Sequence, residues 1–276
     1  MNTSFKALQL KARHQVYTLL NGHNLSRLHG EGYDFAQLRE YQMGDDIRKI
    51  NWTVTAKLGK PYIKELHANR ELSIVTALPA FDGRLYFGNG NAKQDTMVQT
   101  AMLIGYAAQW HNDLFSGIAF TQIQVLAIPP TKHLFQIEHF IQQLHETPLL
   151  HTAVETQASL DALFGRIYKP SLLFVLHDFL EPIDLSLLAQ RHDVIALVIR
   201  ERDEETSPVQ GEVILHDPRS AGMEESYIGK RNRQRYLARL KENDEKMLVH
   251  FSQHDIRYVK IFTDEEPVTK LLELFR

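Results

Sequence analysis

Short runs of consecutive apolar residues recur from about residue 71 onward, with longer segments of helical spacing between them. Strands of a parallel sheet are covered on both faces, so they read as continuous apolar runs rather than as alternating ones. Each run is as long as a strand and too short for a buried helix. The pattern therefore predicts an α/β fold around a mostly parallel sheet. Five strands are predicted, at residues 72–78, 115–120, 172–176, 194–199 and 258–262.

The segments between these runs predict helices that cover the sheet. Apolar residues recur every three or four positions within residues 97–108, 134–144 and 237–251, which is the spacing of one helix face. Two further strand-like pieces, residues 122–128 and 211–216, are each followed by turn residues. We expect these pieces to form edge strands or hairpins.

The first seventy residues differ from the rest in composition and in the pattern of apolar residues. One amphipathic helix is predicted near the N-terminus, and residues 21–60 that follow it are polar, rich in glycine and of mixed charge. A loop of this length is usually functional or an addition to the main fold. The predicted organisation is an N-terminal helix with a long loop extension at 1–70, followed by one domain at 71–276.

The composition excludes several classes of protein. With no cysteine, the chain cannot form a disulfide framework, a thiolate nucleophile, an iron–sulfur cluster or a cysteine-based zinc site. Its 31 Lys and Arg residues nearly balance its 34 Asp and Glu residues, so the net charge does not predict nucleic-acid binding. No apolar run approaches the roughly 18 residues that cross a bilayer, and charged residues interrupt the N-terminus. We expect a cytoplasmic protein that neither binds nucleic acid nor inserts into a membrane.

A long block of the N-terminal segment is recognisable by its landmarks, which are Gly32, Phe35, Leu38, Arg39, Glu40, Tyr41, Gly44, Asp45, Asp46, Arg48, Ile50, Trp52, Tyr62, Lys64, Arg70 and Glu71. This block resembles the signature of a bacterial family known as domain of unknown function 58. The resemblance continues in order through Gly117, Asp178 and Pro218 and covers nearly the whole chain.

The resemblance implies a fold and a setting. The implied fold is similar to the von Willebrand factor type A domain, a doubly wound sheet with helices on both faces. Members of the family resemble accessory proteins of MoxR-type AAA+ ATPases, which act as chaperones on other proteins. The resemblance therefore implies two partners, a MoxR-type ATPase and an unidentified client protein.

Type A domains hold a divalent metal at the carboxyl ends of their strands, where an Asp-x-Ser-x-Ser loop supplies oxygen ligands. The corresponding positions here are Ala80, Asp82 and Arg84, and Thr152 and Asp178 match the later ligands only loosely. Alanine has no side-chain oxygen, and a permanent guanidinium repels a divalent ion. We therefore expect a degenerate site with no metal and no cofactor, in which Arg84 pairs with Asp82 or Asp178.

The charged and aromatic residues of the N-terminal block are candidates for partner binding, because exposed polar loops on a rigid scaffold commonly carry recognition. These candidates are Arg39, Glu40, Asp45, Asp46, Arg48 and Trp52. An ion-pair network that holds the loop against the sheet explains the same residues without any function. Both interpretations remain open on the sequence alone.

The sequence thus favours a non-enzymatic interaction or assembly factor. The alternative is a metal-dependent hydrolase that uses Asp82, Thr152 and Asp178 beside His177. A third hypothesis, nucleic-acid binding, rests on a basic run at residues 230–241, which acidic residues follow within two helical turns.

Overall fold

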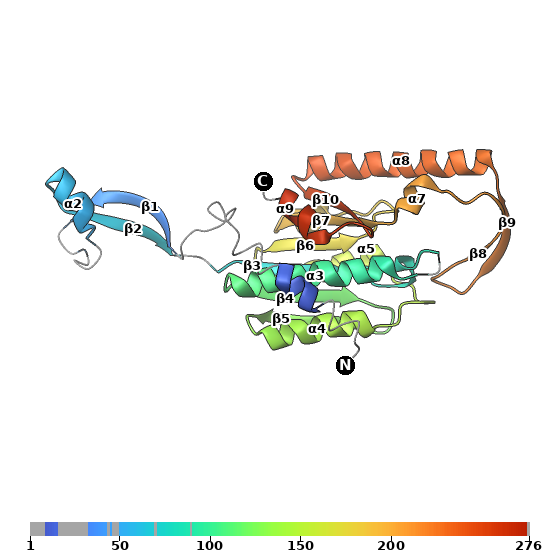
Figure 1. Cartoon of the computed structure of the whole chain (residues 1–276), viewed down its shortest axis with the longest axis horizontal. Coiled ribbons are helices and arrows are strands. Elements are labelled where there is room, and N and C mark those ends of the chain that lie inside the picture. The colour runs from blue at the N-terminus through green and yellow to red at the C-terminus, as the bar shows by residue number, and fades with distance from the viewer. Residues whose placement is uncertain are drawn as a thin grey trace. The chain divides into compact units, whose positions relative to one another are not determined.

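The computed structural model describes residues 9–15, 33–42, 45, 50–68, 71–88 and 90–274. These residues form two compact units, which Figure 1 shows with their elements labelled. The smaller unit lies within residues 17–71, and the larger unit combines residues 9–15 with residues 72–274.

The smaller unit is a β-hairpin with a short helix, so the long loop predicted at residues 21–60 is wrong for residues 33–40 and 52–58. Strand β1 (Tyr33–Glu40) pairs antiparallel with β2 (Tyr62–Ala68), and α2 (Trp52–Leu58) lies between them in the chain. The glycine-rich, mixed-charge composition resembles that of a loop, but the sequence also contains a helix cap and a helix-ending glycine. Asn51 caps α2 by accepting a hydrogen bond from the Val54 N–H, and Gly59 ends the helix at a φ of 71°.

The larger unit is built on a six-stranded sheet in the order β10-β7-β6-β3-β4-β5. The first five strands of that order are parallel, and β5 runs antiparallel to β4 at the edge. The prediction of an α/β fold with a mostly parallel sheet is confirmed. The strands are β3 (Ser73–Leu78), β4 (Leu114–Phe120), β5 (Val125–Thr131), β6 (Leu172–His177), β7 (Asp193–Arg200) and β10 (Arg257–Phe262).

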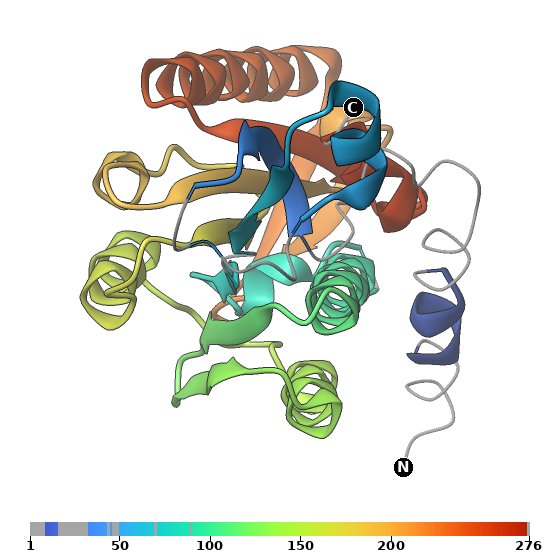
Figure 2. The ribbon, with the colours of Figure 1, turned by 90° about the vertical axis from the view of Figure 1, so that its left-hand side faces the viewer.

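Helices cover both faces of this sheet, as Figure 2 shows. One face carries α3 (Ala92–Trp110), α4 (Leu134–Glu146) and α9 (Pro267–Glu273). The other carries α5 (Thr156–Arg166), α6 (Ser186–Ala189) and α8 (Lys230–Gln253). Short helices η3 (Gly83–Leu85) and α7 (Arg202–Thr206) follow the carboxyl ends of β3 and β7.

Both additional strand-like pieces form strands, with one shift of bounds. The piece expected at residues 122–128 is β5, which extends through Pro129 and Pro130 because an edge strand needs no donor on its outer side. The piece at residues 211–216 is β8 (Gly211–His216), which pairs antiparallel with β9 (Met223–Ile228). The polar sequence of β9 gave no strand signal.

The N-terminal helix belongs to the larger unit. Residues 9–15 are helical, and Ala12 is fully buried. Lys11 Nζ lies 2.7 Å from Glu266 Oε1, and Gln15 donates to the other oxygen of that carboxylate. The predicted segment 1–70 thus contains residues of both compact units. No helix among the described residues is long and apolar enough to cross a membrane.

Gly117 of β4 tests how tightly the sheet and α4 pack. A Cβ atom at Gly117 would lie 2.2 Å from Cε1 of Phe140, a fully buried ring of α4. We expect Gly117→Ala to lower the free energy of unfolding by about 1–3 kcal/mol, because overpacking forces neighbours out of place. Urea denaturation measures this.

Gly165→Ala is the matched control, since a Cβ at Gly165 of α5 has no atom within 4 Å. It should leave stability unchanged or raise it by about 0.5–1 kcal/mol, as alanine favours the helix. Equal stability of Gly117→Ala and the wild type would show that this interface is not tightly packed.

Candidate functional site at the switch point of the sheet

The strand order reverses direction at β3, since β4 follows it on one side and β6 lies on the other. In open α/β sheets, ligands bind outside the carboxyl ends of the strands at such a point. The chain places Asp82 and Arg84 just after β3, and His177 and Asp178 at the end of β6. These four residues form the centre of the candidate site.

Asp82 is a fully buried carboxylate at the start of η3. Its oxygens accept hydrogen bonds from the backbone N–H groups of Arg84, over 3.0 Å, and Val154, over 2.7 Å. A buried charge needs a partner of opposite sign as well as hydrogen bonds. Two backbone donors leave the charge of Asp82 uncompensated.

Arg84 supplies the cation from two residues away. Its Nε atom donates to Asp82 Oδ1 over 2.9 Å, and its Nη2 atom lies 3.4 Å from Oδ2. Nη2 also donates to the carbonyl oxygen of Val154 over 3.1 Å. Burial alone would lower the pKa of Arg84, but its hydrogen bonds to Asp82 and the charge of that carboxylate raise the pKa above its usual value. Of the two carboxylates expected as its partner, Asp82 is the one that Arg84 binds.

His177 lies beside this pair and is fully buried. Its Nε2 atom is 3.2 Å from Arg84 Nη1, and its Nδ1 atom accepts a hydrogen bond from the Phe179 N–H over 2.9 Å. The pKa of His177 is lowered to about 4, mainly by burial and also by the charge of Arg84, against the opposing attraction of Asp178. Because Nδ1 accepts from a backbone N–H, a proton added there would break that hydrogen bond, so His177 is neutral at physiological pH.

Asp178 belongs to a second buried group of charges. Lys93, in the first turn of α3, places its Nζ atom 2.6 Å from Glu204 Oε1 and 3.6 Å from Asp178 Oδ2. All three side chains are at least 97% buried. Burial would raise the pKa of Asp178, but His177, Lys93 and Arg84 together lower it below its usual value. Burial raises the pKa of Glu204, which Lys93 only partly offsets.

Arg200 links this edge of the sheet to α8. Its fully buried guanidinium donates to the carbonyl oxygens of Asp178 and Phe179 and, over 2.9 Å, to Asp244 Oδ1 on α8. Phe179 adopts a φ of 50°, which turns the chain sharply after β6. The helix α8 is therefore fastened by charge to the loop that carries Asp178.

Gly83 allows a third segment to approach. A Cβ atom at Gly83 would lie 2.1 Å from the carbonyl oxygen of Pro218, at the turn between β8 and β9, so only glycine fits. The Gly83 N–H donates to the Thr152 carbonyl over 3.0 Å. The same turn supplies Arg219, whose Nε atom lies 3.6 Å from Asp82 Oδ2 and whose side chain is 34% exposed.

The residues present do not fit a divalent cation. Arg84 already occupies the carboxylate of Asp82, and Ala80 is buried in the core without a side-chain oxygen. The Thr152 hydroxyl donates to the Leu149 carbonyl over 2.6 Å instead of facing Asp82. Among the described residues, no group of three or more His, Asp or Glu side chains is arranged to hold a metal.

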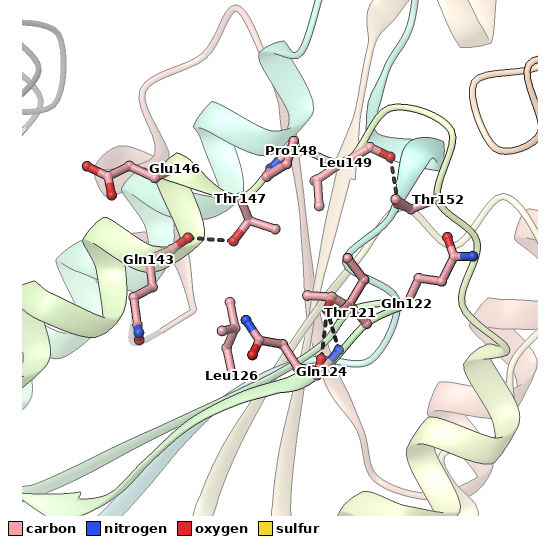
Figure 3. A pocket seen from close by; sticks show the side chains of 11 residues that line it. Thr121, Gln122, Gln124, Leu126, Gln143, Glu146, Thr147, Pro148, Leu149 and Thr152 are labelled. Carbon is pink, nitrogen blue, oxygen red and sulfur yellow. Dashed lines mark hydrogen bonds between the residues drawn. The ribbon is translucent and has the colours of Figure 1, made fainter.

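An open pocket of about 290 Å³ lies next to this site, between the β4–β5 turn and the segment that follows α4. Figure 3 shows polar side chains of threonine, glutamine and glutamate in its lining, together with a few apolar ones. Thr152, whose carbonyl accepts the hydrogen bond from Gly83, is one of the lining residues. Thr121 and Gln124 hydrogen-bond to each other, as do Thr147 and Gln143. These hydrogen bonds join lining residues to one another.

The structure describes some of the residues that were predicted to bind a partner and leaves others out. Asp46 and Arg48 lie outside the described residues, and the side chain of Arg39, in β1, is not described. Glu40 Oε1 is 2.8 Å from Lys60 Nζ, and both side chains are exposed. Asp45 accepts a hydrogen bond from the Gln42 N–H, and Trp52 begins α2 with 66% of its surface exposed.

Several members of the site were not predicted from the sequence. Lys93 begins a helix, Glu204 sits in a polar segment and Arg200 ends a strand, so each has an ordinary surface pattern. One signal was available for Arg200: a charged residue directly follows six consecutive apolar residues, 194–199, all of them buried. Nothing local in the sequence marks Lys93 or Glu204 as buried.

We expect Arg84→Met to lower the free energy of unfolding by about 3 kcal/mol, because it leaves the charge of Asp82 buried without its main partner. Thermal and urea denaturation measure this. The control is Arg202→Met, which removes an arginine whose pair with Asp264 is half exposed and should cost less than about 1 kcal/mol. Equal losses in the two variants would contradict the proposed role of Arg84.

Stability should fall as the pH is lowered from 6.5 to 4. The pKa of His177 is about 4 in the folded protein, below the ordinary histidine value of 6.5, so the unfolded chain binds more protons in that window. A difference of this size corresponds to a loss of about 3 kcal/mol. His177→Gln should remove most of this dependence in urea denaturation, and the exposed control His133→Gln should keep it. A wild-type stability that is flat between pH 4 and 6.5 would refute the assignment.

Solved structures of similar shape share little sequence with this chain. The conserved hypothetical protein BatB from Bacteroides thetaiotaomicron is 9% identical with a TM-score of 0.41, and covers 74% of this chain and 97% of its own. An aerotolerance-related membrane protein from Bacteroides fragilis is 10% identical with a TM-score of 0.42, over 74% and 98% of the two chains.

Sequence relatives are closer. Uncharacterized proteins of Mycobacterium tuberculosis (Rv1480) and Mycobacterium bovis (Mb1516) are each 24% identical over 232 residues, which is 82% of this chain and 73% of theirs. The model of a family described as protein of unknown function DUF58 matches residues 37–246. Since that match spans both compact units and most of the chain, this protein belongs to the DUF58 family.

Proposed function

We propose that this protein is a non-enzymatic interaction or assembly factor that acts in the cytoplasm with a MoxR-type AAA+ ATPase and a client protein. The observation that carries the proposal is the buried pair of Asp82 and Arg84 at the switch point of the sheet. The position at which a type A domain would hold a metal is neutralised here by the protein's own guanidinium.

The site keeps a feature suited to recognition. In a type A domain, the metal can draw a carboxylate of the partner to this edge of the sheet. Arg219 offers a comparable positive group, because its side chain is 34% exposed. A guanidinium of this kind binds carboxylates through two parallel hydrogen bonds. Arg219 is therefore the residue that would contact an acidic side chain of the partner.

The architecture supports a type-A-like assignment. The sheet is doubly wound, helices cover both faces, and the loops after β3 and β6 meet at the carboxyl edge. A rigid sheet that presents loops at one edge is a common recognition scaffold. Trp52 and Asp45 of the smaller unit remain the predicted second contact surface.

The test uses the purified full-length protein and a purified MoxR-type ATPase encoded in the same genome. We expect the two proteins to bind in calorimetry, and Arg219→Glu to weaken binding at least about tenfold, since it places like charges together. The thermal midpoint should fall only slightly, because Arg219 is partly exposed and Arg84 still neutralises Asp82. Lys241→Glu, which reverses one exposed charge on α8, is the control and should bind like the wild type.

Failure of the wild type to bind the ATPase would contradict the proposed partner. A second measurement addresses the hydrolase alternative, which uses Asp82, Thr152 and Asp178. If millimolar Mg²⁺ or Mn²⁺ raises the thermal midpoint of the wild type, a metal binds the folded state. That result, together with phosphatase activity lost in Asp82→Asn, would replace the proposal with the alternative.

A further inference from the structure

The β8–β9 hairpin exposes one whole face to solvent. In the observed register, Glu212 lies opposite Tyr227, Ile214 opposite Glu225, and His216 opposite Met223, so these six side chains share a face. We call them the hairpin face. Met223 is 72% exposed, Tyr227 64% and Ile214 59%. Large apolar side chains gathered in this way commonly mark an interaction site.

The hairpin face also carries uncompensated negative charge. Glu212 and Glu225 are exposed, and neither forms an ion pair with any residue in the described part of the chain. They are two positions apart along the strands, because Glu212 faces Tyr227 and Glu225 faces Ile214. At a rise of about 3.3 Å per residue, this offset is about 7 Å along the strand direction. A surface that binds the hairpin face should therefore offer apolar contacts and two positive charges about 7 Å apart.

The first turns of α8 carry that arrangement. Arg231 and Arg235 are exposed, lie four residues apart on one helix face and form no ion pair with described residues. Their spacing along the helix is about 6 Å, at about 1.5 Å per residue. Like charges at this spacing destabilise a helix, which favours an outside partner of opposite sign.

The two surfaces do not meet within one molecule. The helix α8 follows β9 after a single residue, Gly229, and Figure 1 shows the hairpin extending from the end at which α8 begins. No ion pair joins Glu212 or Glu225 to Arg231 or Arg235 in the described structure. A matched pair of unsatisfied surfaces on one chain can be satisfied by a second copy.

We propose that this protein forms a two-fold dimer in which the hairpin face of each copy binds the start of α8 of the other. Such an interface is isologous, so the same contact forms twice. Arg231 and Arg235 pair with Glu212 and Glu225 of the second copy. Their aliphatic stems cover Ile214 and Met223, and a guanidinium lies over the Tyr227 ring. This inference does not depend on the proposed function.

The experiment is sedimentation equilibrium of the full-length protein from micromolar concentration to about 0.5 mM, the range of weak interfaces. The wild type should show a monomer–dimer equilibrium. The double variant Glu212→Lys/Glu225→Lys, and separately Arg231→Glu/Arg235→Glu, should each weaken the dimer at least about tenfold, because each brings like charges together.

The decisive measurement is the dimerisation of an equimolar mixture of the two double variants. In a mixed dimer, the lysines of one copy face the glutamates of the other, and the unchanged surfaces face each other as in the wild type. The equimolar mixture should dimerise within about threefold of the wild type, a difference of well under 1 kcal/mol. Glu224→Lys is the matched control, since Glu224 is exposed on the opposite face of the same hairpin and should leave the dimer unchanged.

Every other outcome overturns the proposal. It is wrong if the wild type is monomeric throughout, if the double variants dimerise as the wild type does, or if mixing does not restore the dimer. A monomer that binds duplex DNA in a gel-shift assay, and loses that binding in Arg231→Glu/Arg235→Glu, would assign the basic surface to nucleic acid instead. Thermal midpoints equal to the wild type verify that the variants are folded.

Discussion

Burial of ionic groups is the constraint on which this structure depends. Three carboxylates, Asp82, Asp178 and Glu204, lie out of contact with water at one edge of the sheet. An isolated charge in such a place is too costly to keep, and it persists only with a cation and hydrogen bonds. Arg84 sits beside Asp82, and Lys93 sits beside Asp178 and Glu204. A third buried cation, Arg200, pairs with Asp244 of α8 and donates to the carbonyl oxygens that follow β6. These cations come from η3, α3 and β7, so the buried charges are satisfied only when all three elements are in place.

The backbone makes this convergence possible. Gly83 lets the chain after β3 touch the backbone of Pro218, and the left-handed Phe179 turns the chain after β6. Both features bring polar groups into the crevice where the strand order reverses. A protein with a metal there would gain positive charge only on binding the ion. Here the positive charge is covalently part of the chain, so the edge of the sheet is preorganised at all times.

The sequence predicts most of the sheet and only part of the site. Apolar runs such as the one ending at Ile199 identify the buried strands, because a parallel strand covered on both faces has no solvent-facing positions. Arg84 was recognisable because it replaces an expected oxygen ligand close to Asp82. Lys93 and Glu204 were not recognisable, since 111 residues separate them and only the folded topology brings them to 2.6 Å. The β1–β2 hairpin was missed because its turn-rich, charged composition resembles a loop.

The central place of β3 has a consequence for how the chain is made. Its one neighbour, β4, follows within about forty residues, but its other neighbour, β6, begins with Leu172, which pairs with Ile74 in the finished sheet. At about 5–20 residues per second, a ribosome needs on the order of 5 to 20 s to add that intervening stretch. For that time the growing sheet ends in an unpaired, strongly apolar strand edge, the kind of surface that invites pairing with the wrong chain. The interval between the two pairings is a window in which a nascent chain of this topology needs shielding.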